Sequence, residues 1–167
     1  MDVQFDQLRE PSVVAMSAVF AAATTIATMF VAIPVGIGFL NFGEIVIYTA
    51  AFLFGGVVAG LAGGVGAAAA DVLLGYGLFA PITFVVKGLE GFVVGQLSGT
   101  STRSKVIAVL VGAPFMIVGY FLAVAYFEGI PAAIAQELPI DILQAAVGFA
   151  VAYPLSQALQ ERLPQLR

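Results

Sequence analysis

Residues 41–95 read NFGEIVIYTAAFLFGGVVAGLAGGVGAAAADVLLGYGLFAPITFVVKGLEGFVVG, and this stretch decides the fold. It is a series of apolar segments interrupted by four charged side chains, which are Glu44, Asp71, Lys87 and Glu90. An ionisable group at membrane depth costs at least about 2.5–3.5 kcal/mol, so such groups face a protein interior or a polar cavity. We therefore expect the stretch from residue 44 to residue 90 to contain the centre of function.

The composition of the whole chain is that of an integral membrane protein. Its 167 residues are 61% hydrophobic and only 10% charged, with a mean hydropathy of +1.07. Soluble proteins contain about 25% charged residues. No charged residue occurs between residues 11 and 43, 45 and 70, or 106 and 127. The first apolar stretch is too long, and its N-terminal flank too acidic, for a cleaved signal peptide.

Several kinds of chemistry are disfavoured by residues that the sequence lacks. The chain contains no cysteine and no histidine, which excludes thiol chemistry, disulfides, His-ligated metals and Ser-His triads. It also has no phosphate-binding G-x-x-x-x-G-K-[ST] motif and no basic patch suited to nucleic acid. An intramembrane acid–base enzyme that uses Glu44 or Glu90 is a weak alternative. We expect no cofactor, no metal and no enzymatic activity.

The apolar segments predict an all-α protein of six transmembrane helices in a single domain, residues 1–167. About 20 apolar residues span the hydrocarbon core. The expected helices are residues 12–33, 43–60, 62–76, 81–98, 105–127 and 140–159. The glycines between residues 55 and 66 allow either one long helix or two short helices joined by a turn near Gly60–Gly63. The fourth expected helix, residues 81–98, begins at Pro81.

The basic residues favour the arrangement with two short helices. With a turn near Gly60, both termini lie in the cytoplasm, together with Arg9, Arg103, Lys105, Arg162 and Arg167. One long helix would export the loop that carries Arg103 and Lys105, against the positive-inside rule. The sequence therefore predicts a multi-pass protein of the cell membrane with both ends inside.

This topology brings polar side chains together near the outer surface. The predicted binding residues are Asn41, Glu44, Tyr48, Asp71, Lys87, Glu90, Tyr120 and Gln144. Carboxylates, a lysine and tyrosines suit a small polar heteroaromatic compound with hydrogen-bond donors. Other interpretations stay open: Lys87 and Glu90 form a purely structural i,i+3 ion pair, or Glu44 caps a helix N-terminus. Tyr76 is more typical of an interfacial aromatic belt.

Three motifs that follow one another along the chain resemble those of the S components of energy-coupling factor (ECF) transporters. The resemblance is strongest to the riboflavin-type branch. The three motifs are NFGEIVIYTAAFLFGG from Asn41, GGVGAAAADVLLGY from Gly63, and APITFVVKGLEGFVVG from Ala80. The resemblance implies a membrane subunit that captures a vitamin-like substrate outside the cell. It also implies partners, namely a transmembrane T protein and two ATPase subunits that supply the ATP hydrolysis.

The resemblance also implies two structural roles. The loop after the first helix, from Pro34 to Phe42, would act as a lid over the ligand. An A-x-x-x-A pattern on the first helix would dock the T protein, and Ala18 and Ala22 match it, although Ala23 and Ala27 have the same spacing. Small residues let helices approach closely in lipid.

A different class of transporter is the main alternative. A small proton- or ion-coupled secondary transporter could use Asp71, Lys87 and Glu90 as a relay. A chain of 167 residues would then need an oligomer or an inverted repeat. No convincing repeat is visible in the sequence.

Overall fold

The computed structural model describes residues 10–162, and nearly all of them are helical. The long elements are α2 (Pro11–Phe30), α3 (Gly43–Phe54), α4 (Gly56–Leu74), α5 (Ala80–Leu97), α6 (Thr102–Glu128) and α8 (Leu138–Arg162). The short elements are a hairpin of β1 (Ile33–Val35) and β2 (Gly38–Leu40), the turn α7 (Ile130–Ala132) and the π-helical turn η1 (Ala133–Glu137). The expected all-α membrane fold is confirmed.

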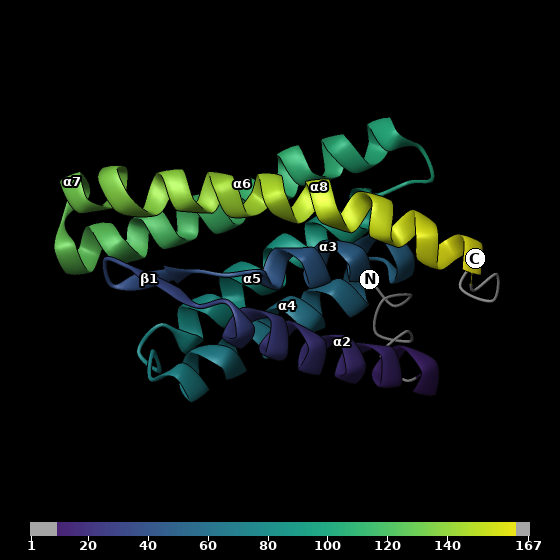
Figure 1. Ribbon diagram of the computed structural model, residues 1–167, viewed down its shortest axis with the longest axis horizontal. Helices are drawn as coiled ribbons and strands as arrows, with labels where there is room; N and C mark the ends of the chain where they lie inside the picture. The colour runs from purple at the N-terminus through teal and green to yellow at the C-terminus, as the bar shows by residue number, and fades with distance from the viewer. Residues whose placement is uncertain (1–9, 163–167) are drawn as a thin grey trace.

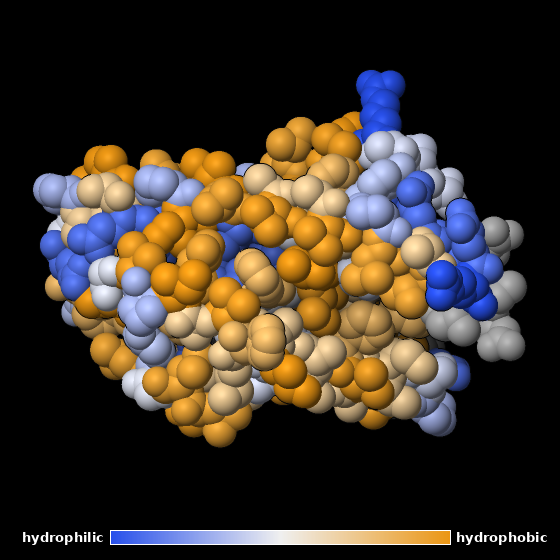
Figure 2. Space-filling view, viewed as in Figure 1, coloured by the Kyte–Doolittle hydropathy of each residue, from blue (hydrophilic) through white to orange (hydrophobic). Residues whose placement is uncertain are grey.

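Within residues 10–162, five helical segments are long and apolar enough to cross a membrane: Pro11–Phe30, Gly56–Leu74, Ala80–Leu97, Thr102–Glu128 and Ile130–Arg162. The sixth, α3, has 12 residues, which at 1.5 Å per residue gives roughly 18 Å against a hydrocarbon core of about 30 Å. Figure 2 shows apolar side chains over the middle of the molecule and polar ones toward its two ends. This distribution is that of a multi-pass membrane protein.

The boundary predicted between helices 43–60 and 62–76 is wrong. The chain turns at Gly55, whose φ of +82° favours glycine, and α4 then continues without interruption through Gly60 and Gly63. Those two glycines serve close helix packing instead. A Cβ atom at Gly63 would lie only 2.5 Å from the carbonyl oxygen of Lys87 on α5. The remaining predicted helix ends differ from the observed ones by a few residues.

The segment expected to be an irregular loop contains an antiparallel hairpin. Ile33 pairs with Leu40 and Val35 with Gly38, and Gly36 occupies the turn with a φ of +58°. Figure 1 shows this hairpin at the same end of the molecule as α7. We call this the hairpin end.

The opposite end gathers the start of α2, the end of α8 and the turn between α5 and α6 (Figure 1). A hydrogen bond of 2.6 Å between the hydroxyls of Thr102 and Tyr153 ties the start of α6 to α8. The basic residues Arg103, Lys105 and Arg162 belong to these segments. Arg9 and Arg167 lie outside the described residues. The arrangement fits the predicted one-sided distribution of positive charge, and the assignment of that side to the cytoplasm stays a prediction.

The helices pack in an order that places the polar residues together. α4 packs against α2 and α5, α5 packs against α6, and α3 packs against α8. Residues from α3, α4, α5, α6 and α8 therefore meet at the centre of the hairpin end.

Candidate substrate pocket

A small cavity of about 40 Å³ lies at the hairpin end between the helices and the hairpin. Six of the eight predicted binding residues line it: Asn41, Glu44, Asp71, Lys87, Tyr120 and Gln144. These six come from five separate segments of the chain, and only the fold brings them to one place.

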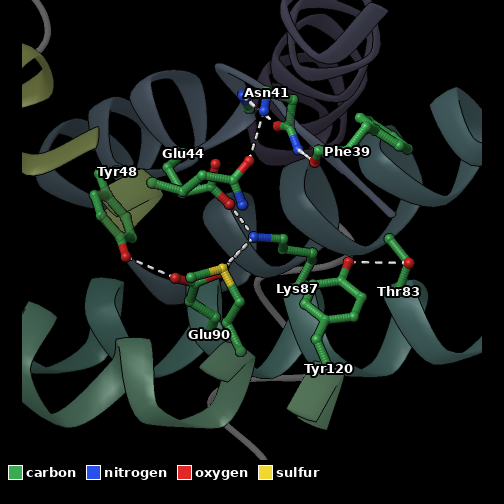
Figure 3. Close-up of polar contacts among 11 residues, drawn as sticks. Phe39, Asn41, Glu44, Tyr48, Thr83, Lys87, Glu90 and Tyr120 are labelled. Atoms are coloured by element: carbon green, nitrogen blue, oxygen red, sulfur yellow. Dashed lines mark hydrogen bonds and ion pairs between the residues drawn. The ribbon is translucent and has the colours of Figure 1, made fainter. Parts of the chain in front are cut away.

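Lys87 occupies the centre of this site, as Figure 3 shows. Its ammonium group pairs with the carboxylate of Glu44, lies 3.4 Å from Oε2 of Glu90, and contacts the sulfur of Met116. It also lies 5.5 Å from the centre of the Tyr120 ring, within reach of a cation–π interaction. Only 3% of Lys87 is exposed. The i,i+3 pair with Glu90 is thus present, and Lys87 lines the cavity as well.

The remaining two predicted residues, Tyr48 and Glu90, do not line the cavity. Both are completely buried, and the Tyr48 hydroxyl donates a hydrogen bond of 2.6 Å to Oε1 of Glu90 (Figure 3). Glu90 in turn faces Lys87. These two side chains therefore support the lysine from behind the cavity wall.

Asn41 and Gln144 join the hairpin to α8. The backbone N–H of Asn41 donates to the side-chain oxygen of Gln144 at 2.6 Å. The Asn41 side-chain oxygen accepts from the N–H of Gly43 at 2.8 Å, at the start of α3. Glu44 lies in the first turn of α3 and makes no capping hydrogen bond, so the alternative that it is an N-cap is wrong. Its carboxylate pairs with Lys87 instead.

The structure adds cavity-lining residues that the sequence patterns did not single out. They are Thr28, Phe39, Tyr76, Phe79, Thr83, Glu137 and Asp141, together with small or apolar neighbours. Tyr76, expected in the interfacial belt, lines the cavity and packs against Phe39 with ring centres 4.9 Å apart. Asp141 is 1% exposed and precedes Gln144 by three residues, so both lie on one face of α8. That spacing is the signal in the sequence that points to Asp141.

Three carboxylates of the cavity wall keep an oxygen with no hydrogen-bond partner among the described residues. They are Oε2 of Glu44, Oδ2 of Asp71 and Oδ2 of Asp141, and all three atoms are buried. Leaving a buried polar atom unpaired costs about 1–3 kcal/mol, and more for a charged group. The described residues contain no group of three potential metal ligands.

Comparison with known proteins identifies the kind of molecule to which this cavity belongs. Residues 10–161 match the family model described as ECF-type riboflavin transporter, S component. The chain belongs to this family. It is 41% identical over 145 residues to an uncharacterized protein in the gap 3′ region of Pyrococcus woesei, covering 84% of this chain and 97% of the relative. It is 32% identical over 117 residues to the thiamine precursor transporter HmpT of Lactococcus lactis subsp. cremoris (strain MG1363). This match covers 70% of this chain and 67% of the relative.

Membership of the family confirms the function class predicted from the three motifs. The protein is a multi-pass membrane subunit that binds substrate for an ECF vitamin transporter, and it is a transport subunit rather than an enzyme. An ion-coupled secondary transporter finds no support in these relatives.

The expected docking residues are available on the surface of this S component. Ala18 and Ala22 are exposed on α2, whereas the buried side of this helix carries Ser17, Thr24 and Thr28. That buried side packs on α4, where a Cβ atom at Gly66 would lie 2.7 Å from the Cβ of Thr24. Ala23 and Ala27 are half-buried. A partner helix would thus reach the Ala18/Ala22 face more readily, and its docking there is a proposal.

Proposed function

We propose that the cavity at the hairpin end captures a small polar heteroaromatic compound from outside the cell. The compound is then delivered inward with a T protein and two ATPase subunits. The proposed ligand contacts are Asn41, Glu44, Asp71, Lys87, Tyr120 and Gln144, with Tyr48 and Glu90 as supports.

One observation carries this proposal: buried polar side chains from five helices converge on a cavity that keeps unpaired acceptor oxygens. A membrane protein accumulates such groups at a cost, and a structural role would be expected to pair them. A ligand with N–H or O–H donors would supply the missing partners.

The size of the cavity implies that the site opens to admit its ligand. A volume of about 40 Å³ holds roughly three water molecules at ~10–15 Å³ each. The hairpin contributes Gly38 and Phe39 to the wall and is joined to α8 through Asn41 and Gln144. We propose that the segment from Pro34 to Phe42 acts as the lid, moving outward for entry and closing on the bound ligand.

The names of one relative and of the family suggest two candidate classes of substrate. One relative is named a thiamine precursor transporter, and the family is named for riboflavin. A compound of one ring would require less opening of this cavity than a three-ring flavin. A pyrimidine therefore fits the proposal better than riboflavin.

Native mass spectrometry of protein purified gently from its own membranes tests the capture role. We expect a heteroaromatic adduct on the wild-type chain that is lost when Asp71→Asn and Gln144→Ala are combined. Glu128→Gln, an exposed carboxylate outside the cavity, is the matched control and should keep the adduct. An adduct that survives the double change would place the ligand elsewhere.

Transport energetics test the second half of the proposal. Uptake of the identified compound by cells that carry the T protein and ATPases should survive an uncoupler and stop on ATP depletion. The opposite result would favour the ion-coupled alternative.

A further inference from the structure

We propose that the ligand of this pocket is an organic cation, a small heteroaromatic ring that carries a protonated amine or a charged ring nitrogen. We further propose that Asp141 is the residue that selects for this charge. The inference rests on the proposed function, since it assumes that the cavity at the hairpin end is the capture site.

The charges around the cavity do not balance. Four carboxylates line it, Glu44, Asp71, Glu137 and Asp141, against a single ammonium group from Lys87. Lys87 is already paired with Glu44 and with Glu90, which lies behind the wall. Among residues 10–162 no other ion pair is present. The other three carboxylates, Asp71, Glu137 and Asp141, therefore have no ion-pair partner in the described part of the chain.

Asp71 and Asp141 show this imbalance at the level of single atoms. Asp71 is 5% exposed and Asp141 is 1% exposed. Each keeps one buried oxygen without a hydrogen-bond donor among the described residues. A carboxylate shielded from water gains most from a charged donor, because a charge-assisted hydrogen bond is about twice as strong as a neutral one.

The rest of the wall favours an organic cation over an inorganic one. Four aromatic rings border the cavity, those of Phe39, Tyr76, Phe79 and Tyr120. Aromatic faces attract cations and stack on planar rings. The carboxylates are dispersed over three helices and a π-helical turn, and the described residues form no cluster of three metal ligands. A flat, charged ring would contact both the aromatic faces and the carboxylates.

Asp141 is the more deeply buried of the two carboxylates, at 1% exposed against 5% for Asp71. It makes no ion pair or hydrogen bond with Lys87 or Glu44 among the described residues. Changing it to asparagine keeps its shape and one acceptor oxygen while it removes the charge. The change should therefore alter selectivity between charged and neutral ligands and leave the lysine network intact.

Two pyrimidines that differ in one substituent test the inference on full-length protein in lipid nanodiscs. The first is 4-amino-5-aminomethyl-2-methylpyrimidine, whose side-chain amine is protonated at neutral pH. The second is its neutral 5-hydroxymethyl counterpart. Calorimetric titration at pH 7 should give a Kd for the charged compound at least about tenfold lower. Asp141→Asn should remove that preference, and Glu128→Gln should retain it. Thermal unfolding checks that each variant is folded.

Each result decides a different statement. If the wild type binds the neutral compound as tightly as the charged one, the charge inference is wrong and the capture site stands. If Asp141→Asn weakens both compounds equally, Asp141 contributes shape and does not select for charge. If folded wild-type protein binds neither pyrimidine, nor riboflavin, nor any adduct seen by native mass spectrometry, the proposed function itself fails.

Discussion

Lys87 on α5 and Glu44 on α3 form an ion pair between residues 43 positions apart in the sequence, and both side chains are buried. Glu90, one turn along α5, is the second carboxylate beside the same ammonium group. The pair joins α3, the helix that follows the hairpin, to α5. Lys87 both lines the cavity and pairs with buried carboxylates, so its proposed contact with ligand and its contribution to stability can be measured separately.

The structural role of Lys87 predicts a large loss of stability on its removal. Lys87→Met leaves Glu44 and Glu90 as buried carboxylates without a cation, and we expect the free energy of unfolding to fall by about 3–5 kcal/mol. Adding Glu44→Gln and Glu90→Gln should restore most of it. Thermal unfolding in detergent measures this, with Arg103→Met as the exposed control. An unchanged midpoint for Lys87→Met would show that the pair does not stabilise the fold.

Tyr48 is predicted to affect stability rather than ligand contact. Its hydroxyl donates to Glu90 but does not reach the cavity. Tyr48→Phe removes a hydrogen bond to a charged group, worth about 1.5–3 kcal/mol, and should change ligand affinity by less than about threefold (~0.7 kcal/mol). Tyr120→Phe, at the cavity wall, is the comparison and should have the larger effect on affinity. A larger loss of ligand affinity in Tyr48→Phe than in Tyr120→Phe would instead indicate that Tyr48 contacts the ligand.

Two glycines on α5 are predicted to differ sharply in their tolerance of alanine. A Cβ at Gly91 would lie 2.4 Å from the carbonyl oxygen of Ala59 on α4, whereas the nearest atom to one at Gly88 is 3.6 Å away. Gly91→Ala should separate the helices and cost about 1–3 kcal/mol. Gly88→Ala should be neutral or stabilise by up to about 1 kcal/mol through helix propensity. Equal effects in thermal unfolding would argue against close α4–α5 packing.

The exposed face of α2 is predicted to dock the T protein. Ala18→Trp or Ala22→Trp should abolish uptake and assembly with the energising subunits, since a bulky ring holds two helices apart. Ligand binding by the isolated subunit should be nearly unchanged. Leu110→Trp is the control. Leu110 is 69% exposed on α6, and Figure 1 shows α6 and α2 on opposite sides of the bundle. Co-purification of intact complexes with either alanine variant would exclude this face.

The orientation in the membrane is open to cysteine labelling, because the chain has no native cysteine. Ser101→Cys, in the turn between α5 and α6, should be protected from a membrane-impermeant maleimide in intact cells. Leu78→Cys, 69% exposed at the hairpin end, should react. Labelling of position 101 alone would invert the proposed topology.

Hydropathy and charge in the sequence are enough to predict the helical membrane fold, the order of the helices and the region of the pocket. Because a charge in lipid is costly, the positions of Glu44, Asp71 and Lys87 within apolar segments are enough to single them out. The family motifs lie in the same region. These signals are local, and they depend on composition and on spacing within one segment.

The turn at Gly55, the hairpin, and the contributions of Tyr76 and Asp141 are decided only by the tertiary structure. Gly60 and Gly63 look like turn residues in sequence, yet α5 approaches them so closely that their function is packing. Asp141 occurs in an ordinary run of α8, and its burial in the cavity depends on how α8 packs against α3. Spacing along one helix specifies a face, but the packing of helices distant in sequence determines whether that face meets lipid or ligand.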